Sequence, residues 1–423
     1  MRRHIPWGAS RRQTTSPPLR IGLWAVVMLL AAGASPGVAV EIRGQADLGH
    51  VAGQDARTAG YSGLGKGVGE GLGVLARATL RFDGDLFATF PATLVVEAGR
   101  GRKTLAGIQE ASVGWHPVPR GSWRTRIRAG AFFPVPSLEV GYDSVGWRPT
   151  RTLSSSAVNT WFSEELRSTG LEAEFLRRGV MSGSPHTFGV TASVFMGNDP
   201  NGTLLSWRGW NLGSRVVNLA EPITLPDLPV YRADGAIPLQ TRRARVFREI
   251  DGRAGLNAGL RYGHRGWLDV SLLRYDNRAD PLRIVQGQYA WNTRFDHASL
   301  RLRVGGNWEI LAQGLQGSTR MGPNAVNLDF AAGYLLASHP LGRGHATVRH
   351  DRFQTRDRDG LPGDPNDESG NAWALAYAVP LQDGVEILTE ALWIDSTRPA
   401  RDLVGEAPRQ VERRLSMLLR WRY

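Results

Sequence analysis

The chain ends in Leu415-Ser416-Met417-Leu418-Leu419-Arg420-Trp421-Arg422-Tyr423, in which every second residue is apolar or aromatic. Ser416, Arg420 and Arg422 fall on the other face, and Leu418 is the one exception there. Successive side chains of a β-strand point to opposite faces, so the pattern predicts a strand with an apolar medium on one side and water on the other. An edge strand of a soluble sheet would show the same alternation, so the rest of the chain has to decide between the two.

About 16 segments of roughly ten residues share this alternation from residue 40 onward. Connections between them alternate in length: short ones such as Arg265-Gly266 and Gln382-Asp383-Gly384 are rich in turn formers, and others are long. This arrangement is typical of a transmembrane antiparallel β-barrel with short periplasmic turns and long extracellular loops. The predicted strand centres are Ala46, Ala78, Val95, Val113, Ile127, Ala173, Ala192, Ala258, Val270, Leu302, Leu311, Phe330, Val348, Leu375, Ile387 and Met417.

Tryptophans cluster at the ends of these segments. Indole rings favour the interface between hydrocarbon and headgroups, so two aromatic girdles are expected, which a core of scattered tryptophans would not produce. The periplasmic girdle would contain Trp115, Trp123, Trp267, Trp308 and Trp421, and the extracellular one Trp291, Trp373 and Trp393.

Residues 1–39 have the three parts of a secretory signal: arginines, the apolar run 21–32, and small residues before a cleavage site. The run is too short to span a bilayer as a helix. We therefore expect export, removal of residues 1–39, and a single barrel domain over residues 40–423 in the bacterial outer membrane.

Composition narrows the function further. The chain has no cysteine, so neither disulfides nor a lipid-anchoring cysteine is expected. Removing the five signal arginines from 51 basic residues leaves 46 against 39 acidic ones, a net charge of +7. These arginines are spread at strand spacing rather than clustered, which argues against nucleic-acid binding.

If the apolar face of each strand meets lipid, a set of arginines faces the lumen. Guanidinium groups bind carboxylate and phosphate through paired donors, so an anion preference follows where they dominate the narrowest point. The alternative is that each arginine pairs with a lumen acid and only stiffens the wall. The predicted pore-lining residues are Arg77, Arg81, Arg124, Arg126, Arg128, Arg261, Arg301, Arg303 and Arg420.

Two long connections stand out. Residues 134–165 carry prolines and aromatic side chains and are the best candidate for a constriction loop that folds inward, with Glu139, Tyr142, Asp143, Arg148 and Arg151 facing the passage. Residues 197–251 are expected outside, with extra short strands. The acidic residues of 357–368 could hold calcium, but a solvated loop explains them better.

Signatures of an enzyme are scarce. The chain lacks a G-x-S-x-G elbow and an H-E-x-x-H pair, as well as any cysteine nucleophile. No enzymatic activity, cofactor or metal is therefore expected. A dispersed serine and histidine would still permit a barrel enzyme such as a lipid hydrolase, and long loops could instead serve adhesion or polysaccharide export.

With these features the chain resembles the 16-stranded bacterial outer-membrane porins. Residues 129–139 are similar to the strand-to-loop passage of phosphate-selective porins of the O and P type, although the lysine-rich ladder of those porins has no counterpart here, where lysine occurs only at Lys66 and Lys103. The resemblance implies contact with outer-membrane lipid, a homotrimer, and a C-terminal signal at Trp421 and Tyr423 that is read by the barrel assembly machinery. It also implies diffusion of small hydrophilic solutes, which the lumen arginines would bias toward anions.

Overall fold

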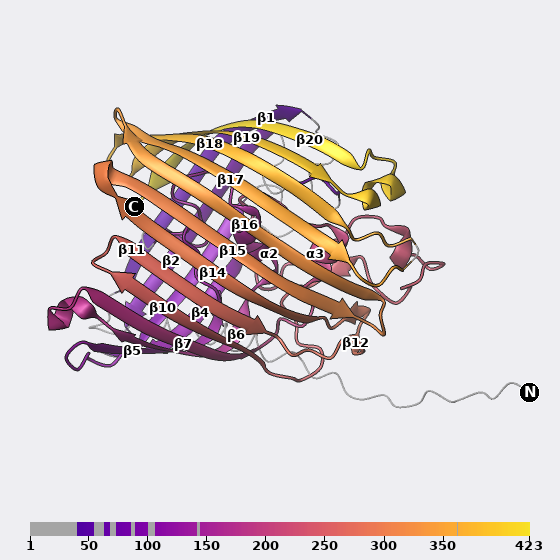
Figure 1. The fold of residues 1–423 in the computed structure, drawn as a ribbon, viewed down its shortest axis with the longest axis horizontal. Coiled ribbons are helices and arrows are strands. Elements are labelled where there is room, and N and C mark those ends of the chain that lie inside the picture. The colour runs from indigo at the N-terminus through magenta and orange to yellow at the C-terminus, as the bar shows by residue number, and fades with distance from the viewer. Residues whose placement is uncertain are drawn as a thin grey trace, which may run out of the picture.

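The computed structural model describes residues 40–54, 63–67, 73–85, 89–99, 106–141, 144–361 and 363–423. Sixteen of the described strands form one closed antiparallel barrel in chain order, and β20 pairs with β1 to close it (Figure 1). All the predicted strand centres lie within these strands, so the prediction of an all-β barrel of about 16 strands is confirmed. The barrel strands are β1 (Val40–Gln54), β2 (Gly73–Asp85), β3 (Pro91–Gly99), β4 (Ala106–Trp115), β5 (Trp123–Phe132), β6 (Ser168–Arg177), β7 (His186–Met196), β10 (Gly255–His264), β11 (Leu268–Asp276), β14 (Asn292–Val304), β15 (Trp308–Met321), β16 (Val326–Leu341), β17 (Gly344–Asp357), β18 (Glu368–Gln382), β19 (Val385–Thr397) and β20 (Arg409–Arg422).

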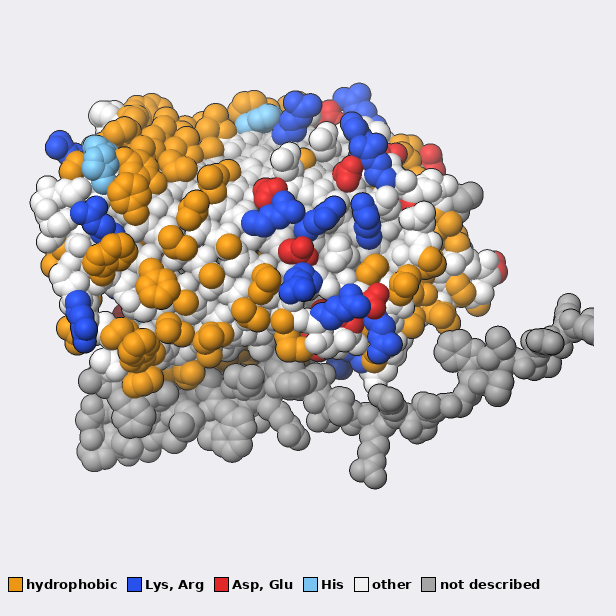
Figure 2. All heavy atoms as spheres, turned by 60° about the horizontal axis from the view of Figure 1, so that its bottom comes forward, with side chains coloured by type: hydrophobic (Ala, Val, Ile, Leu, Met, Phe, Trp, Pro, Cys, Tyr) orange, Lys and Arg blue, Asp and Glu red, His pale blue; other side chains and the backbone are white. Residues whose placement is uncertain are grey.

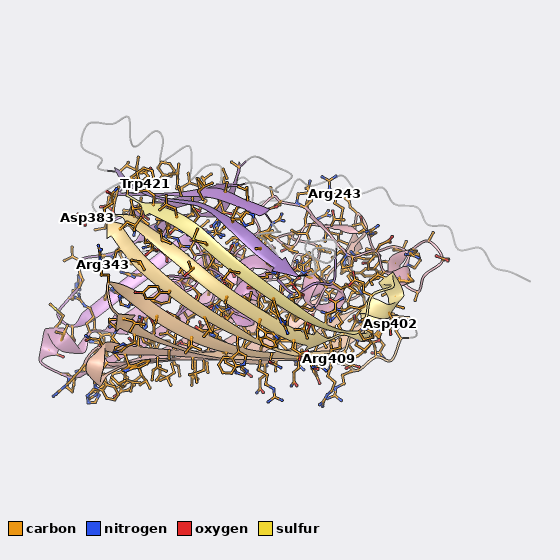
Figure 3. All side chains as sticks on the ribbon, turned by 90° about the horizontal axis from the view of Figure 1, so that it is seen from above. Arg243, Arg343, Asp383, Asp402, Arg409 and Trp421 are labelled. Atoms are coloured by element: carbon orange, nitrogen blue, oxygen red, sulfur yellow. The ribbon has the colours of Figure 1, made fainter. Side chains whose placement is uncertain are left out.

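The barrel has two unlike ends. Arg343, Asp383 and Trp421 lie at one end, where short turns join the strands, and we name it the turn end (Figure 3). Arg243, Asp402 and Arg409 lie at the other, which we name the loop end (Figure 3). Gly384 shows why the turns need glycine: its φ is +72°, and a Cβ there would lie 2.3 Å from the Arg422 carbonyl oxygen.

The two faces of β20 have the predicted character. Leu415, Met417 and Trp421 point outward and are 63%, 58% and 49% exposed, whereas Arg420 is buried on the inner face. Leu418, the exception in the pattern, is also buried on the inner face, in a small apolar cluster with residues that include Val51 and Leu388. Between Leu415 and Trp421, β20 therefore exposes apolar side chains outward and holds Arg420 within, as a strand of a membrane barrel does.

The connections after β5 and β7 both enter the barrel. The first contains α2 (Ala157–Glu165), and the second contains α3 (Thr203–Trp207), and both helices are fully buried (Figure 1). Trp161 of α2 packs against inward-facing Phe295 and Phe330 of the wall, with ring centroids 5.2 Å apart in each case. The inward path of residues 134–165 was expected, but the expectation that residues 197–251 lie outside the barrel is wrong for the many residues of that segment that are buried.

Short elements complete the connections. The pair β8 (Ile223–Thr224) and β9 (Arg243–Ala244) supplies the extra strands expected in residues 197–251, and β12 (Ile284–Val285) pairs with β13 (Gln288–Tyr289). Single 3₁₀ turns are η2 (Gly179–Ser182), η3 (Pro229–Tyr231), η4 (Gly305–Asn307) and η5 (Pro399–Val404). No helix in the described ranges is long and apolar enough to cross a membrane.

Candidate channel interior

Arginines of the turn-end half pair with acids of the adjacent strand on the inner face. Arg128 of β5 lies 2.8 Å from Glu172 of β6, and Arg261 of β10 lies 2.9 Å from Asp269 of β11. These arginines alternate along their strands with outward-facing residues such as Leu260, which is 60% exposed. The phase of the strands therefore places both partners of each pair toward the interior.

Arginine is the more exposed partner in several of these pairs. The exposed fractions are 36% and 12% for Arg128 and Glu172, 37% and 23% for Arg261 and Asp269, and 55% and 17% for Arg303 and Glu309. Arg124 and Arg301 are about as exposed as their partners. In these three pairs the guanidinium group is therefore more accessible to solvent than the carboxylate.

A hollow of about 200 Å³ lies between this wall and the inserted segment. Arg261 and Arg301 line it from the wall, together with Asp269. Residues 136–138, 140 and 141 line the opposite side. The structure thus brings two of the predicted pore-lining arginines to the loop that was predicted to form the constriction.

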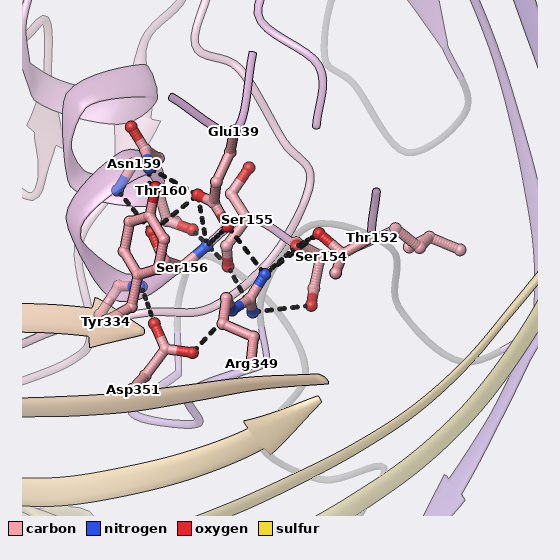
Figure 4. A network of polar contacts seen from close by, with 12 residues as sticks. Glu139, Thr152, Ser154, Ser155, Ser156, Asn159, Thr160, Tyr334, Arg349 and Asp351 are labelled. Atoms are coloured by element: carbon pink, nitrogen blue, oxygen red, sulfur yellow. Dashed lines mark hydrogen bonds and ion pairs between the residues drawn. The ribbon is translucent and has the colours of Figure 1, made fainter. Parts of the chain in front are cut away.

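Arg349 of β17 ties the inserted segment to the wall (Figure 4). Its guanidinium donates to Glu139 at 3.0 Å and to Asp351 at 2.7 Å, and all three side chains are buried. It also donates to the Ser154 carbonyl at 2.5 Å and to the Ser155 carbonyl at 3.2 Å. A single wall arginine therefore fixes both the start of the segment and the approach to α2.

The sequence just before α2 explains why a helix starts there. Ser156 is the N-cap residue, and its side chain accepts a hydrogen bond from the Asn159 backbone N–H at 3.2 Å. Glu139 in turn accepts from the Ser156 N–H at 3.0 Å and from its hydroxyl at 2.7 Å. Burial raises the pKa of Glu139, and the charge of Arg349 opposes that shift.

A second buried network holds the segment at the β1–β20 seam. Asp47 of β1 accepts from Arg77 at 2.7 Å and from Arg420 at 2.8 Å, and Arg420 is fully buried. Arg148 of the inserted segment donates to Glu97 of β3 and to the Ser214 carbonyl. These arginines match the structural alternative, in which inward arginines pair with acids and stiffen the wall.

A third buried network in the described ranges lies at the loop end. Lys66 lies 2.8 Å from Glu368, which also pairs with Arg398 at 3.0 Å, and all three side chains have no exposed surface. Lys66 further donates to the Arg208 carbonyl, which follows α3, at 3.0 Å. Burial lowers the pKa of Lys66 to about 7, although Glu368 opposes the shift.

Glu165 links the two inserted helices. It is the last residue of α2, and it accepts from the backbone N–H of Leu204 at 2.7 Å and of Leu205 at 3.1 Å, both in α3. Trp161 donates to it from the ring nitrogen at 2.8 Å. Burial raises the pKa of Glu165 to about 7, and these donors oppose the shift.

The predicted residues thus fall into two groups. Arg124, Arg126, Arg128, Arg261, Arg301 and Arg303 lie in the wetter turn-end half, whereas Arg77, Arg148, Arg420 and Glu139 take part in buried networks. Arg81 pairs with Asp83 at 2.7 Å, and Arg151 of the inserted segment pairs with Glu309 at 3.2 Å. Tyr142 and Asp143 lie outside the described residues, and the pore-lining roles of all these groups stay predictions.

Several buried groups of the interior were not predicted. Arg349 and Asp351 lie on a strand whose alternation was recognised, but nothing local marks them as partners of Glu139. Lys66 and Glu165 lie in connections between strands, where no alternation predicts the direction of a side chain. Buried-type residues such as Trp207 and Trp210 in a supposed loop were the available sign that residues 197–251 fold inward.

Carboxylates gather at two places in the loop-end connections. Asp199, Glu249 and Asp251 have oxygens within 4.8 Å of one another and are the residues in the described ranges that could hold a metal ion. The acids of residues 357–368 instead accept from the chain itself: Asp359 accepts from the Asn327 N–H at 2.7 Å, and Asp367 from the Asp357 N–H at 3.0 Å. These carboxylates therefore accept hydrogen bonds from the backbone around them, and calcium binding by this loop stays untested.

The C-terminal aromatic pair lies on the outside of the seam. Trp421 and Tyr423 stack with ring centroids 5.1 Å apart. The Tyr423 backbone exchanges two hydrogen bonds with Gly44 of β1, each 3.1 Å long. A Cβ at Gly44 would lie 2.0 Å from Cε1 of the Tyr423 ring, so only glycine leaves room for the ring in this position.

No protein-family model matches the chain, and no curated protein matches it. Solved structures do share its fold. An anion-selective porin from Comamonas acidovorans has a TM-score of 0.51 at 12% identity, over 91% of this chain and 100% of that one. The outer membrane channel DcaP of Acinetobacter baumannii has a TM-score of 0.51 at 9% identity, over 92% and 99%. OmpT in its trimer form, an outer membrane protein of Vibrio cholerae, has a TM-score of 0.50 at 10% identity, over 91% and 99%. The chain therefore has the fold of the 16-stranded outer-membrane porins.

Proposed function

We propose that the chain is an outer-membrane porin through which small hydrophilic solutes diffuse, with a preference for anions. The observation that carries the proposal is the turn-end interior, in which Arg128, Arg261 and Arg303 are each more exposed than their acidic partners. Fixed positive charge at a narrow, wet passage lowers the energy of an anion there and raises that of a cation.

The outer surface supports a place in a membrane. Large apolar side chains of many strands are exposed outward, among them Leu260, Leu272, Leu335 and Leu415 at 54% or more. Such a surface would be unstable in water and suits hydrocarbon. Export through residues 1–39, and assembly through the Trp421 and Tyr423 signal, belong to the same proposal, as does a homotrimer, the form named for the OmpT structure.

The inserted segments set the expected size of the passage. Because α2, α3 and the networks around Arg349 and Glu368 fill the loop-end half with buried side chains, any passage beside them is narrow. We expect a small unit conductance, well below that of a 16-stranded barrel whose loops stay outside.

The enzyme alternative receives less support from the described residues. Within the described ranges, histidine rings hydrogen-bond Tyr262, Gln313 and the Gly306 carbonyl, and none hydrogen-bonds a serine hydroxyl. A serine hydrolase needs that pairing to activate its nucleophile. Among the residues that the structure describes, no arrangement specifically favours adhesion or polysaccharide export.

Single-channel recording tests the proposal. The chain without residues 1–39, folded and inserted into a planar lipid bilayer, should give discrete conductance steps of uniform size. The same preparation should release no fatty acid from phospholipid vesicles. Absence of steps together with lipid turnover would support the hydrolase instead.

A further inference from the structure

The outer wall carries a groove between β10 and β16. Its floor includes small residues of three neighbouring strands, namely Ala298, Gly314 and Ala331, and Ala298 lies opposite Gly314 in the sheet. Leu260 and Leu272, exposed by 60% and 54%, rise along one side. The groove has a volume of about 760 Å³, which is within the range of roughly 300–1,000 Å³ that is typical of small-molecule sites.

A charged hollow of about 400 Å³ continues this groove toward the loop end. The two share Arg274, Asp296, Gln316 and Ala331, so they form one continuous depression. Figure 2 shows the corresponding change on the surface, where a band of charged side chains crosses the face between a hydrophobic region and the loop end.

The hollow has more positive charge than negative. Four arginines and two aspartates line it, and two of the arginines are paired: Arg274 with Asp296 at 2.6 Å, and Arg358 with Asp329 at 2.8 Å. The other two, Arg294 and Arg356, make no ion pair within the described part of the chain. Two guanidinium groups therefore face outward above an apolar groove.

We propose that this depression binds one phosphorylated lipid of the outer leaflet. An acyl chain lies on the floor that contains Ala298, Gly314 and Ala331, and the phosphate group lies in the charged hollow that Arg294 and Arg356 line. The inference rests on the membrane location in the proposed function, but on neither solute passage nor its selectivity.

The arginines, rather than the apolar groove, give this site its preference for a lipid that carries a phosphate group. An acyl chain is equally apolar in the bilayer and in the groove, so the groove contributes fit without a hydrophobic gain. A phosphate gains charge-assisted hydrogen bonds from guanidinium groups, which match its oxygens in pairs. A second copy of the chain seated on the same wall would bring its own arginines, and the excess positive charge disfavours that occupant.

Native mass spectrometry of the folded chain in detergent micelles tests the proposal, with dioleoyl phosphatidic acid and dioleoyl phosphatidylcholine as the added lipids. One phosphatidic acid should bind more tightly than phosphatidylcholine. Arg294→Gln with Arg356→Gln should weaken that binding by about tenfold or more, because two charge-assisted bonds are lost. Arg409→Gln, an exposed arginine on the outer face of β20, is the matched control and should bind as the wild type does.

Gly314→Leu tests the acyl part independently. A Cβ at Gly314 would meet nothing nearer than the Ala332 carbonyl oxygen at 3.8 Å, so the new side chain fills the groove without straining the barrel. It should also weaken phosphatidic acid binding. Equal binding of the two lipids by the wild type would overturn the proposal. Wild-type affinity of Gly314→Leu for phosphatidic acid would also overturn it, as would tight binding of inorganic phosphate alone. A Gly314→Leu variant that changes the oligomeric mass but not the binding of lipid would overturn it as well.

The same variants separate this inference from the proposed function. Their side chains lie on the outer wall, so bilayer conductance should equal that of the wild type. A wild-type chain that gives normal conductance steps but binds the two lipids equally contradicts the lipid site alone, whereas a wild-type chain that gives no steps contradicts the porin proposal.

Discussion

Replacing Arg349 with methionine should release the inserted segment from the barrel wall. Arg349→Met removes the hydrogen bonds to Glu139, Asp351 and the Ser154 and Ser155 carbonyls, and it leaves two carboxylates buried without a cation. Breaking a buried ion pair from one side costs about 3–5 kcal/mol. At 1.4 kcal/mol per factor of ten, detachment of the segment should become roughly two to four orders of magnitude more frequent.

Hydrogen exchange followed by mass spectrometry measures that detachment in residues 150–166. Exchange there should accelerate in Arg349→Met, while the barrel strands keep wild-type protection. Arg352→Met is the matched control, because Arg352 lies on the outer face of the same strand and surface changes typically stay within about 0.5 kcal/mol. Equal exchange in Arg349→Met and Arg352→Met would refute the anchoring role of Arg349.

A neutralised background separates buried charge from lost packing. Combining Arg349→Met with Glu139→Gln and Asp351→Asn removes the uncompensated carboxylates, so part of the protection should return. If the triple variant exchanges as fast as Arg349→Met, the loss comes from the hydrogen bonds and packing of the guanidinium rather than from stranded charge.

Three further outcomes are expected. Arg126→Glu, on the inner face opposite Glu174, should weaken the anion preference measured by reversal potential, and an unchanged potential would remove Arg126 from the filter. Glu165 has a pKa of about 7 in the folded chain against 4.5 in the unfolded one, so its contribution is most favourable below pH 4.5 and is lost as the pH rises to 7, by about 3 kcal/mol at most. Exchange of residues 157–165, corrected for the intrinsic rate, should therefore accelerate between pH 5 and 8 in the wild type but not in Glu165→Gln, and parallel profiles would contradict the shift. Gly44→Ala should displace the Tyr423 ring and cost about 1–3 kcal/mol, seen as a lower unfolding temperature on gels, while an unchanged temperature would show that the ring position is unimportant.

The strands could be predicted because alternation is a local property. In each segment, from the one around Ala46 to the one around Met417, apolar and polar residues alternate with a period of two, so each strand can be recognised from its own residues. The short connections between neighbouring segments then predict that these strands pair antiparallel. Leu418 breaks the pattern, yet it lies on the inner face as the phase requires, because an apolar cluster with Val51 and Leu388 exists inside the barrel. A single inward apolar residue therefore signals local packing, not an error in register.

The filled interior could not be predicted in the same way, because its contacts join distant parts of the chain. Lys66 meets Glu368, and the Leu153 backbone N–H donates to Glu390 at 2.8 Å. The alternation along their strands places both Arg261 and Arg420 on the inner face of the barrel. The inserted segments decide the difference in exposure: Arg420 is buried and paired with Asp47, whereas Arg261 stays 37% exposed. The sequence thus predicts whether an arginine points into the barrel. Its access to water depends on the path of the loops, which the alternation of residues does not determine.

The reversal potential across a potassium chloride gradient tests the central claim most directly. If exposed arginines such as Arg261 and Arg303 line a continuous passage, the folded chain in a planar bilayer should show a potential whose sign reports chloride as the more permeant ion. A potential near zero, or one whose sign reports potassium as the more permeant ion, would contradict that claim.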